Sequence, residues 1–95
     1  MKEYKIEFTA EAEEDLSGAY LWYQKVSGEL ANRFSSEAIS AIETLKIFPN
    51  RFRIRFDRYR AISINNFPYL IFYRIKKDSV QIAKIWHTKR DYGKS

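Results

Sequence analysis

Cysteine is absent from this chain of 95 residues, and histidine, glycine and proline are scarce. Without cysteine there are no disulfides and no thiolate chemistry, which fits a reducing compartment. A single histidine and scattered carboxylates do not make a zinc-ligand pattern, so we expect neither a metal nor a cofactor. The three glycines, at positions 18, 28 and 93, form no phosphate-cradling loop. No nucleophile elbow or serine triad can be read either.

Long hydrophobic runs are also missing. No stretch approaches the roughly 20 apolar residues that a transmembrane helix needs, and the first residues hold no apolar stretch of signal-peptide length. We therefore expect a single domain over residues 1–95 that is cytoplasmic and makes no membrane contact. The uncharged stretch Phe67–Tyr73 is too short to span a bilayer and favours a buried strand.

Charge is divided unevenly along the chain. Residues 1–50 hold five Lys/Arg and nine Asp/Glu, whereas residues 51–95 hold twelve and three. The two parts therefore carry −4 and +9, which together give the net charge of +5. A basic surface attracts a polyanion or an acidic protein partner. The alternative is a solvated basic sheet edge without a ligand.

Apolar spacing in the first half predicts one strand and two helices. Residues 4–8 alternate as in a half-buried strand. Thr9 is a good N-cap for a helix, and the carboxylates that follow it suit a helix N-terminus better than a metal site. Residues 27–29 break this helix, and a second amphipathic helix follows until Pro49 ends it. The short connection indicates an antiparallel helical hairpin.

Beyond Pro49 the apolar period changes from helical to alternating. Four stretches are predicted to be strands: residues 51–56, 59–64, 69–75 and 80–87. Their short turns imply antiparallel neighbours. The expected fold class is α+β, with an N-terminal strand, a two-helix hairpin and a three- to four-stranded, mainly antiparallel sheet. The stretch 69–75, apolar on both faces, is expected to be a central strand with helices over one face.

Cationic side chains interleaved with aromatics supply the candidate functional residues, in "RFRIRFDRYR" (51–60) and "WHTKRDY" (86–92). Arginine and lysine contact phosphates, and aromatic rings stack on unpaired bases. RNA cleavage by its own 2′-hydroxyl needs a base, an acid and cations. Five side chains are of suitable types: Arg60, His87, Lys89, Arg90 and Tyr92. The structural alternatives are that His87 caps the sheet edge and that Arg60 holds a carboxylate.

Four segments occur in a recognisable order: "YKIEFTAEAEEDLSGAYLWY", "ANRFSSEAISAIETLKIFP", "YRAISINNFPYLIFYRI" and "IAKIWHTKRD". The third segment and the closing His87-x-x-Arg90-Asp91 are the most specific. Together, over about residues 4–91, the segments make the chain resemble the ParE/RelE superfamily of type II toxins, in particular its ParE-like branch. The resemblance implies a helical hairpin against a curved, mainly antiparallel sheet. It also implies a toxin that a cognate antitoxin wraps and neutralises, with the basic half facing an acidic antitoxin segment.

Two positions depart from the RelE-like branch, whose members cut messenger RNA on the ribosome. That branch commonly has an arginine directly after the tyrosine of the third strand, where Leu70 follows Tyr69 here. It often has two cations two residues apart in the second strand, where Arg60 is followed by Ile62 here. These departures favour a ParE-like inhibitor of DNA gyrase that does not cleave RNA.

The resemblance assigns roles to the candidate residues under each hypothesis. For a gyrase inhibitor, the residues expected to contact the target or the antitoxin are Arg60, His87, Lys89 and Arg90. For a ribosome-dependent endoribonuclease, the catalytic set would be these four residues together with Tyr92. A third alternative is a non-toxic relic that only binds its antitoxin.

Overall fold

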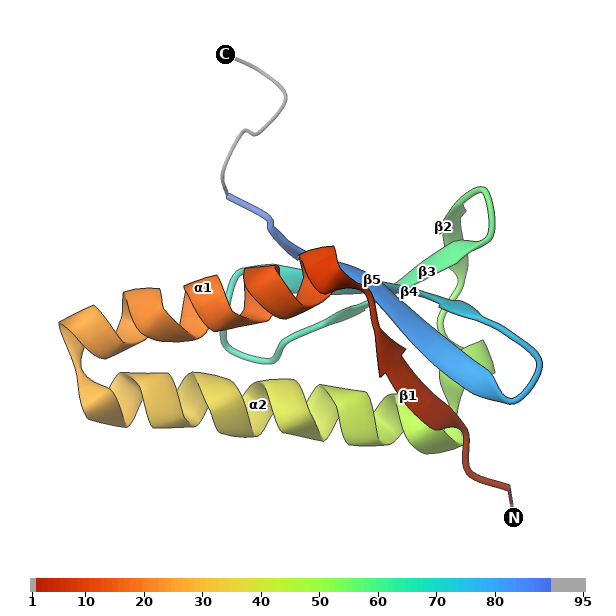
Figure 1. Ribbon diagram of the computed structural model, residues 1–95, viewed down its shortest axis with the longest axis horizontal. Helices are drawn as coiled ribbons and strands as arrows, with labels where there is room; N and C mark the ends of the chain where they lie inside the picture. Colours follow the sequence, from red (N-terminus) through yellow and green to blue (C-terminus); the bar gives the residue numbers. More distant parts are fainter. Residues whose placement is uncertain (1, 90–95) are drawn as a thin grey trace.

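The structure is a computed structural model that describes residues 2–89 (Figure 1). The elements follow in the order β1 (Lys5–Phe8), α1 (Ala10–Val26), α2 (Gly28–Ile47), the 3-10 turn η1 (Pro49–Arg51), β2 (Ile54–Phe56), β3 (Tyr59–Ser63), β4 (Tyr69–Ile75) and β5 (Ser79–His87). Within these residues the strands form one five-stranded sheet, and the two helices form an antiparallel hairpin beside it. The expected α+β class is confirmed.

Side-chain caps set the bounds of the two helices. The hydroxyl of Thr9 accepts a hydrogen bond from the backbone N–H of Ala12 at 3.0 Å and so starts α1. Ser27 lies between the helices in an extended conformation, and its hydroxyl accepts from the N–H of Leu30 at 3.1 Å. Because Ser27 ends α1 and caps α2 at once, the chain reverses within one residue and the helices become antiparallel.

The strand order in the sheet is β1-β5-β4-β3-β2. β1 runs parallel to β5, with Lys5 opposite Ser79, and the other neighbouring pairs are antiparallel. β4 lies between β3 and β5, which confirms the expectation that residues 69–75 form a central strand. Neither helix within residues 2–89 has the length and apolar content that crossing a bilayer requires.

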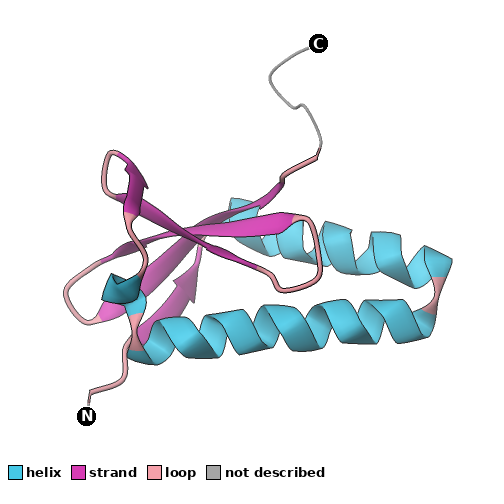
Figure 2. Ribbon diagram, turned by 180° about the vertical axis from the view of Figure 1, so that it is seen from behind, coloured by secondary structure: helices cyan, strands magenta, loops and turns pink. Residues whose placement is uncertain are grey.

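The main core lies between the helical hairpin and one face of the sheet, which we call the covered face (Figure 2). Phe34 of α2 lies at its centre, with its ring 5.2 to 5.4 Å from the rings of Tyr23, Phe67 and Tyr69. The buried side chains of the covered face are Tyr69, Ile71, Tyr73, Val80, Ile82 and Ile85. The opposite side of the sheet, the open face, carries Leu70, Phe72, Arg74, Lys84 and Trp86, all half-buried.

The stretch 51–56 is not the continuous strand that its alternation predicts. Only Ile54–Phe56 form β2, and the chain before them makes the turn η1. Two side chains of the sheet explain the difference, because they bind one backbone carbonyl within this stretch and one just before it. Arg60 Nη1 donates to the carbonyl of Phe52 at 2.6 Å, and Tyr73 Oη donates to the carbonyl of Pro49 at 2.7 Å. The β2–β3 ladder therefore begins only at Ile54.

Thr9 and α1 bind the part of the β5 edge that β1 does not cover. β1 pairs with β5 only as far as Ile82, and the next hydrogen-bond partners come from Thr9 and from Asp15 of α1. The backbone N–H of Thr9 donates to the carbonyl of Ile82 at 3.0 Å, and the Thr9 hydroxyl donates to the carbonyl of Ala83 at 2.9 Å. The N–H of Ile85 donates to Asp15 Oδ2 at 3.0 Å. These bonds pair backbone groups of an edge that would otherwise be open.

Candidate functional site

Arg60 lies on the covered face, opposite Tyr73 in the β3–β4 pair. Its Nη1 donates to the carbonyl of Phe52 at 2.6 Å and to that of Asn50 at 3.4 Å. The idea that Arg60 holds a carboxylate is therefore wrong within the described residues, since its hydrogen-bond partners are backbone carbonyls. The guanidinium anchors the chain that leads into β2.

Tyr73 completes this anchor from the neighbouring strand. Its side chain is fully buried, and its hydroxyl donates to the carbonyl of Pro49 at 2.7 Å. Burial raises the pKa of Tyr73 to about 12, and the positive charge of Arg60 opposes this shift. The phenol is therefore protonated at neutral pH and can keep its hydrogen bond.

His87 ends β5 and lies opposite Tyr69, with ring centroids 4.8 Å apart. Its Nδ1 accepts a hydrogen bond from the backbone N–H of Lys89 at 3.1 Å. This geometry agrees with the alternative in which His87 closes the end of the strand. The structure brings His87 and the exposed Lys89 together, whereas Arg90 and Tyr92 lie outside the described residues.

Arg60 and His87 are not brought together. They lie opposite Tyr73 and Tyr69, which are four residues apart on β4. At about 3.3 Å per residue along a strand, this separation is about 13 Å. Leu70 lies on the open face of the sheet, whereas Arg60 lies on the covered face. General acid–base catalysis needs its groups within hydrogen-bond reach of one substrate, and the described candidates do not meet this condition as a set.

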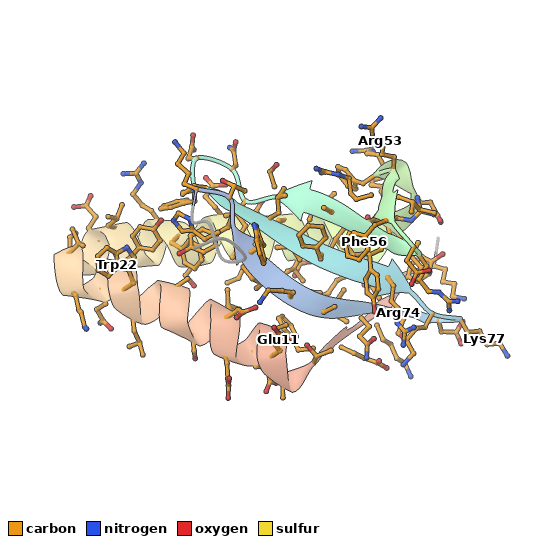
Figure 3. The ribbon with its side chains drawn as sticks, turned by 90° about the horizontal axis from the view of Figure 1, so that it is seen from above. Glu11, Trp22, Arg53, Phe56, Arg74 and Lys77 are labelled. Atoms are coloured by element: carbon orange, nitrogen blue, oxygen red, sulfur yellow. The ribbon has the colours of Figure 1, made fainter. Side chains whose placement is uncertain are left out.

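Three exposed arginines lie in the β2–β3 hairpin and directly before it. We call Arg53, Arg55 and Arg58 the arginine hairpin; all three are exposed, and the side chain of none makes a hydrogen bond or ion pair within residues 2–89. The ion pairs found there use lysines instead: Lys2–Asp78, Lys46–Glu43, Lys76–Glu7 and Lys84 with Glu11 and Asp15. The arginine hairpin therefore presents unneutralised positive charge at one end of the sheet, where Figure 3 labels Arg53. Such a patch attracts an anionic partner.

Sequence reasoning missed an apolar groove between the two helices. The groove has a volume of about 640 Å³, and its lining includes Leu16, Tyr20, Leu21, Ile39 and Ile42. Leu21 and Ile39 are each 56% exposed. These two residues lie outside the apolar stripe that packs on the sheet, and an extra apolar residue on each helix is the signal that could have revealed the groove.

No group of three or more His, Asp or Glu side chains within residues 2–89 is placed to hold a metal ion. Two of the carboxylates at the start of α1 contact β5 instead. Asp15 accepts from the N–H of Ile85, and Glu11 pairs with Lys84 at 2.9 Å. Both carboxylates therefore tie α1 to β5.

Comparisons with known proteins agree with this architecture. The family model "ParE toxin of type II toxin-antitoxin system, parDE" matches residues 6–92. One similar solved structure is "Chromosomal ParDE TA system from P. aeruginosa", with a TM-score of 0.78 and 20% sequence identity. That match covers 90% of this chain and 97% of the other. No curated protein matches. At this identity the structural match shows a shared fold.

Proposed function

Because the chain belongs to the ParE toxin family of type II toxin–antitoxin systems, we propose that it inhibits DNA gyrase and that a cognate antitoxin neutralises it. The family match over residues 6–92 carries this proposal. We place the protein in the cytoplasm, where gyrase and an antitoxin would both reach it.

The chemistry of the sheet supports inhibition by binding over cleavage of RNA. Transition-state charge on a phosphate is stabilised by preorganised donors and cations. Leu70 and Ile62 are apolar at the two positions where the RelE-like branch tends to carry cations. The Arg60 guanidinium is engaged with the carbonyls of Phe52 and Asn50. The residues left for contact with a target or an antitoxin are His87, Lys89 and Arg90, and we add the arginine hairpin to them.

The direct test is supercoiling by purified gyrase in the presence of this protein. We expect supercoiling to stop, and the cognate antitoxin to restore it. Lys89→Ala should weaken the inhibition, whereas Lys77→Ala should not, because Lys77 is also an exposed lysine but lies in the turn before the other end of β5. Supercoiling that stays untouched at a large molar excess of the wild-type protein would overturn the proposal.

The second candidate is a ribosome-dependent messenger RNA endoribonuclease. The observation that favours it is the bond from the backbone N–H of Lys89 to His87 Nδ1 at 3.1 Å, which orients the single imidazole of the chain. Its test is primer extension on messenger RNA from translating ribosomes. Absence of cuts with the wild type rejects this activity, and unchanged cuts with Arg90→Ala plus Tyr92→Phe reject the assigned residues. Normal growth on induction without antitoxin would support a non-toxic relic over both candidates.

A further inference from the structure

The open face of the sheet contains a slot lined by aromatic rings. We call Phe56, Tyr59, Phe72 and Trp86 the aromatic slot; its volume is about 370 Å³. The Phe56 ring lies 5.4 Å from that of Tyr59 and 5.8 Å from that of Phe72, as measured between centroids. Figure 3 shows the Phe56 side chain over the sheet. The slot therefore crosses three strands and ends at β5.

A β-bulge directs Phe56 into this slot. The register of the β2–β3 pair shifts between Ile54 and Phe56, so Ile54 lies opposite Arg60 while Phe56 lies opposite Tyr59. Arg60 is on the covered face and Tyr59 on the open face, which sends the two apolar side chains of β2 to opposite faces. Bulges commonly re-aim a side chain in this way.

The fold does not need the aromatic slot as core. Its rings lie outside the set of buried side chains that pack between the helices and the sheet, and Phe56 remains 57% exposed. Keeping a large ring in contact with water gives up most of the stabilisation that burying it would provide. Exposed apolar surface of this kind marks a binding site.

Charge divides the surroundings of the aromatic slot into two sides. On the α1 side, Lys84 pairs with Glu11 at 2.9 Å and with Asp15 at 3.3 Å, so its charge is neutralised. On the β4 side, Arg74 follows Phe72 on the same face, and its Nε donates to Gln81 Oε1 at 2.9 Å. Gln81 is neutral, and Arg74 has no carboxylate partner within residues 2–89.

This division favours a protein segment over a nucleic acid. A phosphate backbone that followed the slot toward α1 would approach the carboxylates of Glu11 and Asp15, which repel it. A peptide can carry an apolar side chain in one position and a carboxylate in another, and so can match both sides. Arginine also suits carboxylates because its guanidinium can form two parallel hydrogen bonds with them.

We propose that the aromatic slot binds an apolar side chain of a partner-protein segment that also presents a carboxylate to Arg74. Such a segment needs one apolar anchor and, beside it, an acidic residue on the β4 side. Such binding would not require that the protein inhibits gyrase, because it depends only on the shape and charge of the open face.

A random peptide library selected against the immobilised full chain tests the proposal. We expect the wild type to enrich peptides with an aromatic or leucine anchor beside Asp or Glu. For the enriched peptides, Phe56→Ser should weaken binding by roughly tenfold or more, as truncation of a central anchor does. Ile54→Ser is the matched control, because Ile54 is 50% exposed on the same strand but faces the other way. It should change affinity less than about twofold.

A second pair of variants tests whether the bound peptide needs a carboxylate that pairs with Arg74. Arg74→Ala should weaken the binding of the enriched peptides by about tenfold. Arg53→Ala should leave their affinity unchanged, because Figure 3 places Arg53 away from Phe56 and Arg74. Thermal melting of each variant verifies that it is folded. Enrichment that is equal on wild type and Phe56→Ser, or enriched peptides without acidic residues, would overturn the proposal. Single-stranded oligothymidylate that displaces an enriched peptide and loses binding in Phe56→Ser would assign the slot to nucleic acid instead.

Discussion

The two faces of β4 differ although they belong to the same seven residues. Tyr69, Ile71 and Tyr73 are buried under the helical hairpin, whereas Leu70 and Phe72 are half-buried on the open face. The covered face specifies the fold, because its side chains fill a closed core. The open face keeps aromatic and cationic groups within reach of a partner. A strand whose first five residues carry no charge therefore combines a structural face with a recognition face.

The largest expected effect comes from truncating one side chain on each face of β4 and comparing the loss of stability. Ile71→Ala should lower the free energy of unfolding by about 2–5 kcal/mol, since it leaves a cavity in a core that is fully closed there. Phe72→Ala should cost roughly 1 kcal/mol, because one side of its ring already faces the slot. Urea denaturation at neutral pH measures both values. Equal losses would contradict the distinction between the faces.

Truncating the anchored Arg60 should cost more stability than truncating the exposed Arg58. Arg60→Ala should lower stability by about 1–3 kcal/mol, because the carbonyls of Phe52 and Asn50 lose their donor. Arg58→Ala should change stability by less than about 0.5 kcal/mol, since the exposed Arg58 has no partner in the described part of the chain. Paired thermal melts compare the two variants, and a costly Arg58→Ala would argue against the free arginine hairpin.

Alkaline pH should loosen the covered face through Tyr73. Its pKa is raised from 10.0 to about 12, so the folded state holds this proton more tightly than the unfolded chain does. The resulting stability is fully present below pH 10 and is lost as the pH rises toward 12. Wild type should therefore lose about 1 kcal/mol more than Tyr73→Phe between pH 8 and about pH 11. Denaturation curves at the two pH values measure this difference, and parallel losses would rule out Tyr73 as the source.

The smallest expected effect lies where α1 borders β5. In Asp15→Asn the amide oxygen can still accept from the N–H of Ile85, so mainly the ion pair with Lys84 is lost. We expect a loss of about 0.5 kcal/mol that shrinks in high salt. Glu11→Gln, which removes the more exposed ion pair of Lys84, is the matched control and should cost less. Asp15→Asn that costs several kcal/mol would show that the carboxylate charge itself holds the edge of β5.

Much of the fold was predictable because local signals and tertiary packing agree. Thr9 and Ser27 are good caps by residue type, and both act as caps in the structure. The apolar stretch 69–75 has no reasonable place except between two strands under helices, and β4 occupies that place. Strand residues 51–53 were predicted wrongly, because Arg60 binds the carbonyl of Phe52 and Tyr73 binds that of the preceding Pro49, so this segment turns before it joins the sheet.

The candidate site was less predictable, for a geometric reason. Sequence identified Arg60 as a cation on an alternating strand, but strand register decides which face it occupies and which carbonyls it reaches. Phe56 was equally ambiguous, because the bulge beside it reverses the face that simple alternation would assign. Two surface features, the aromatic slot and the groove between the helices, are each lined by residues from several elements. No single segment of the sequence therefore predicts either of them.

The parallel pairing of β1 with β5 has a consequence for how this protein acquires its shape during synthesis. Lys5 and Ser79, which lie opposite each other, are far apart in sequence, so the sheet cannot close until the ribosome has released nearly all of the described chain. β1 and the helical hairpin emerge first, but the apolar stripe of the hairpin has no sheet to cover until β4 and β5 are synthesised. Long-range pairing of this kind slows folding. The fold, and any function that depends on it, is therefore complete only near the end of synthesis.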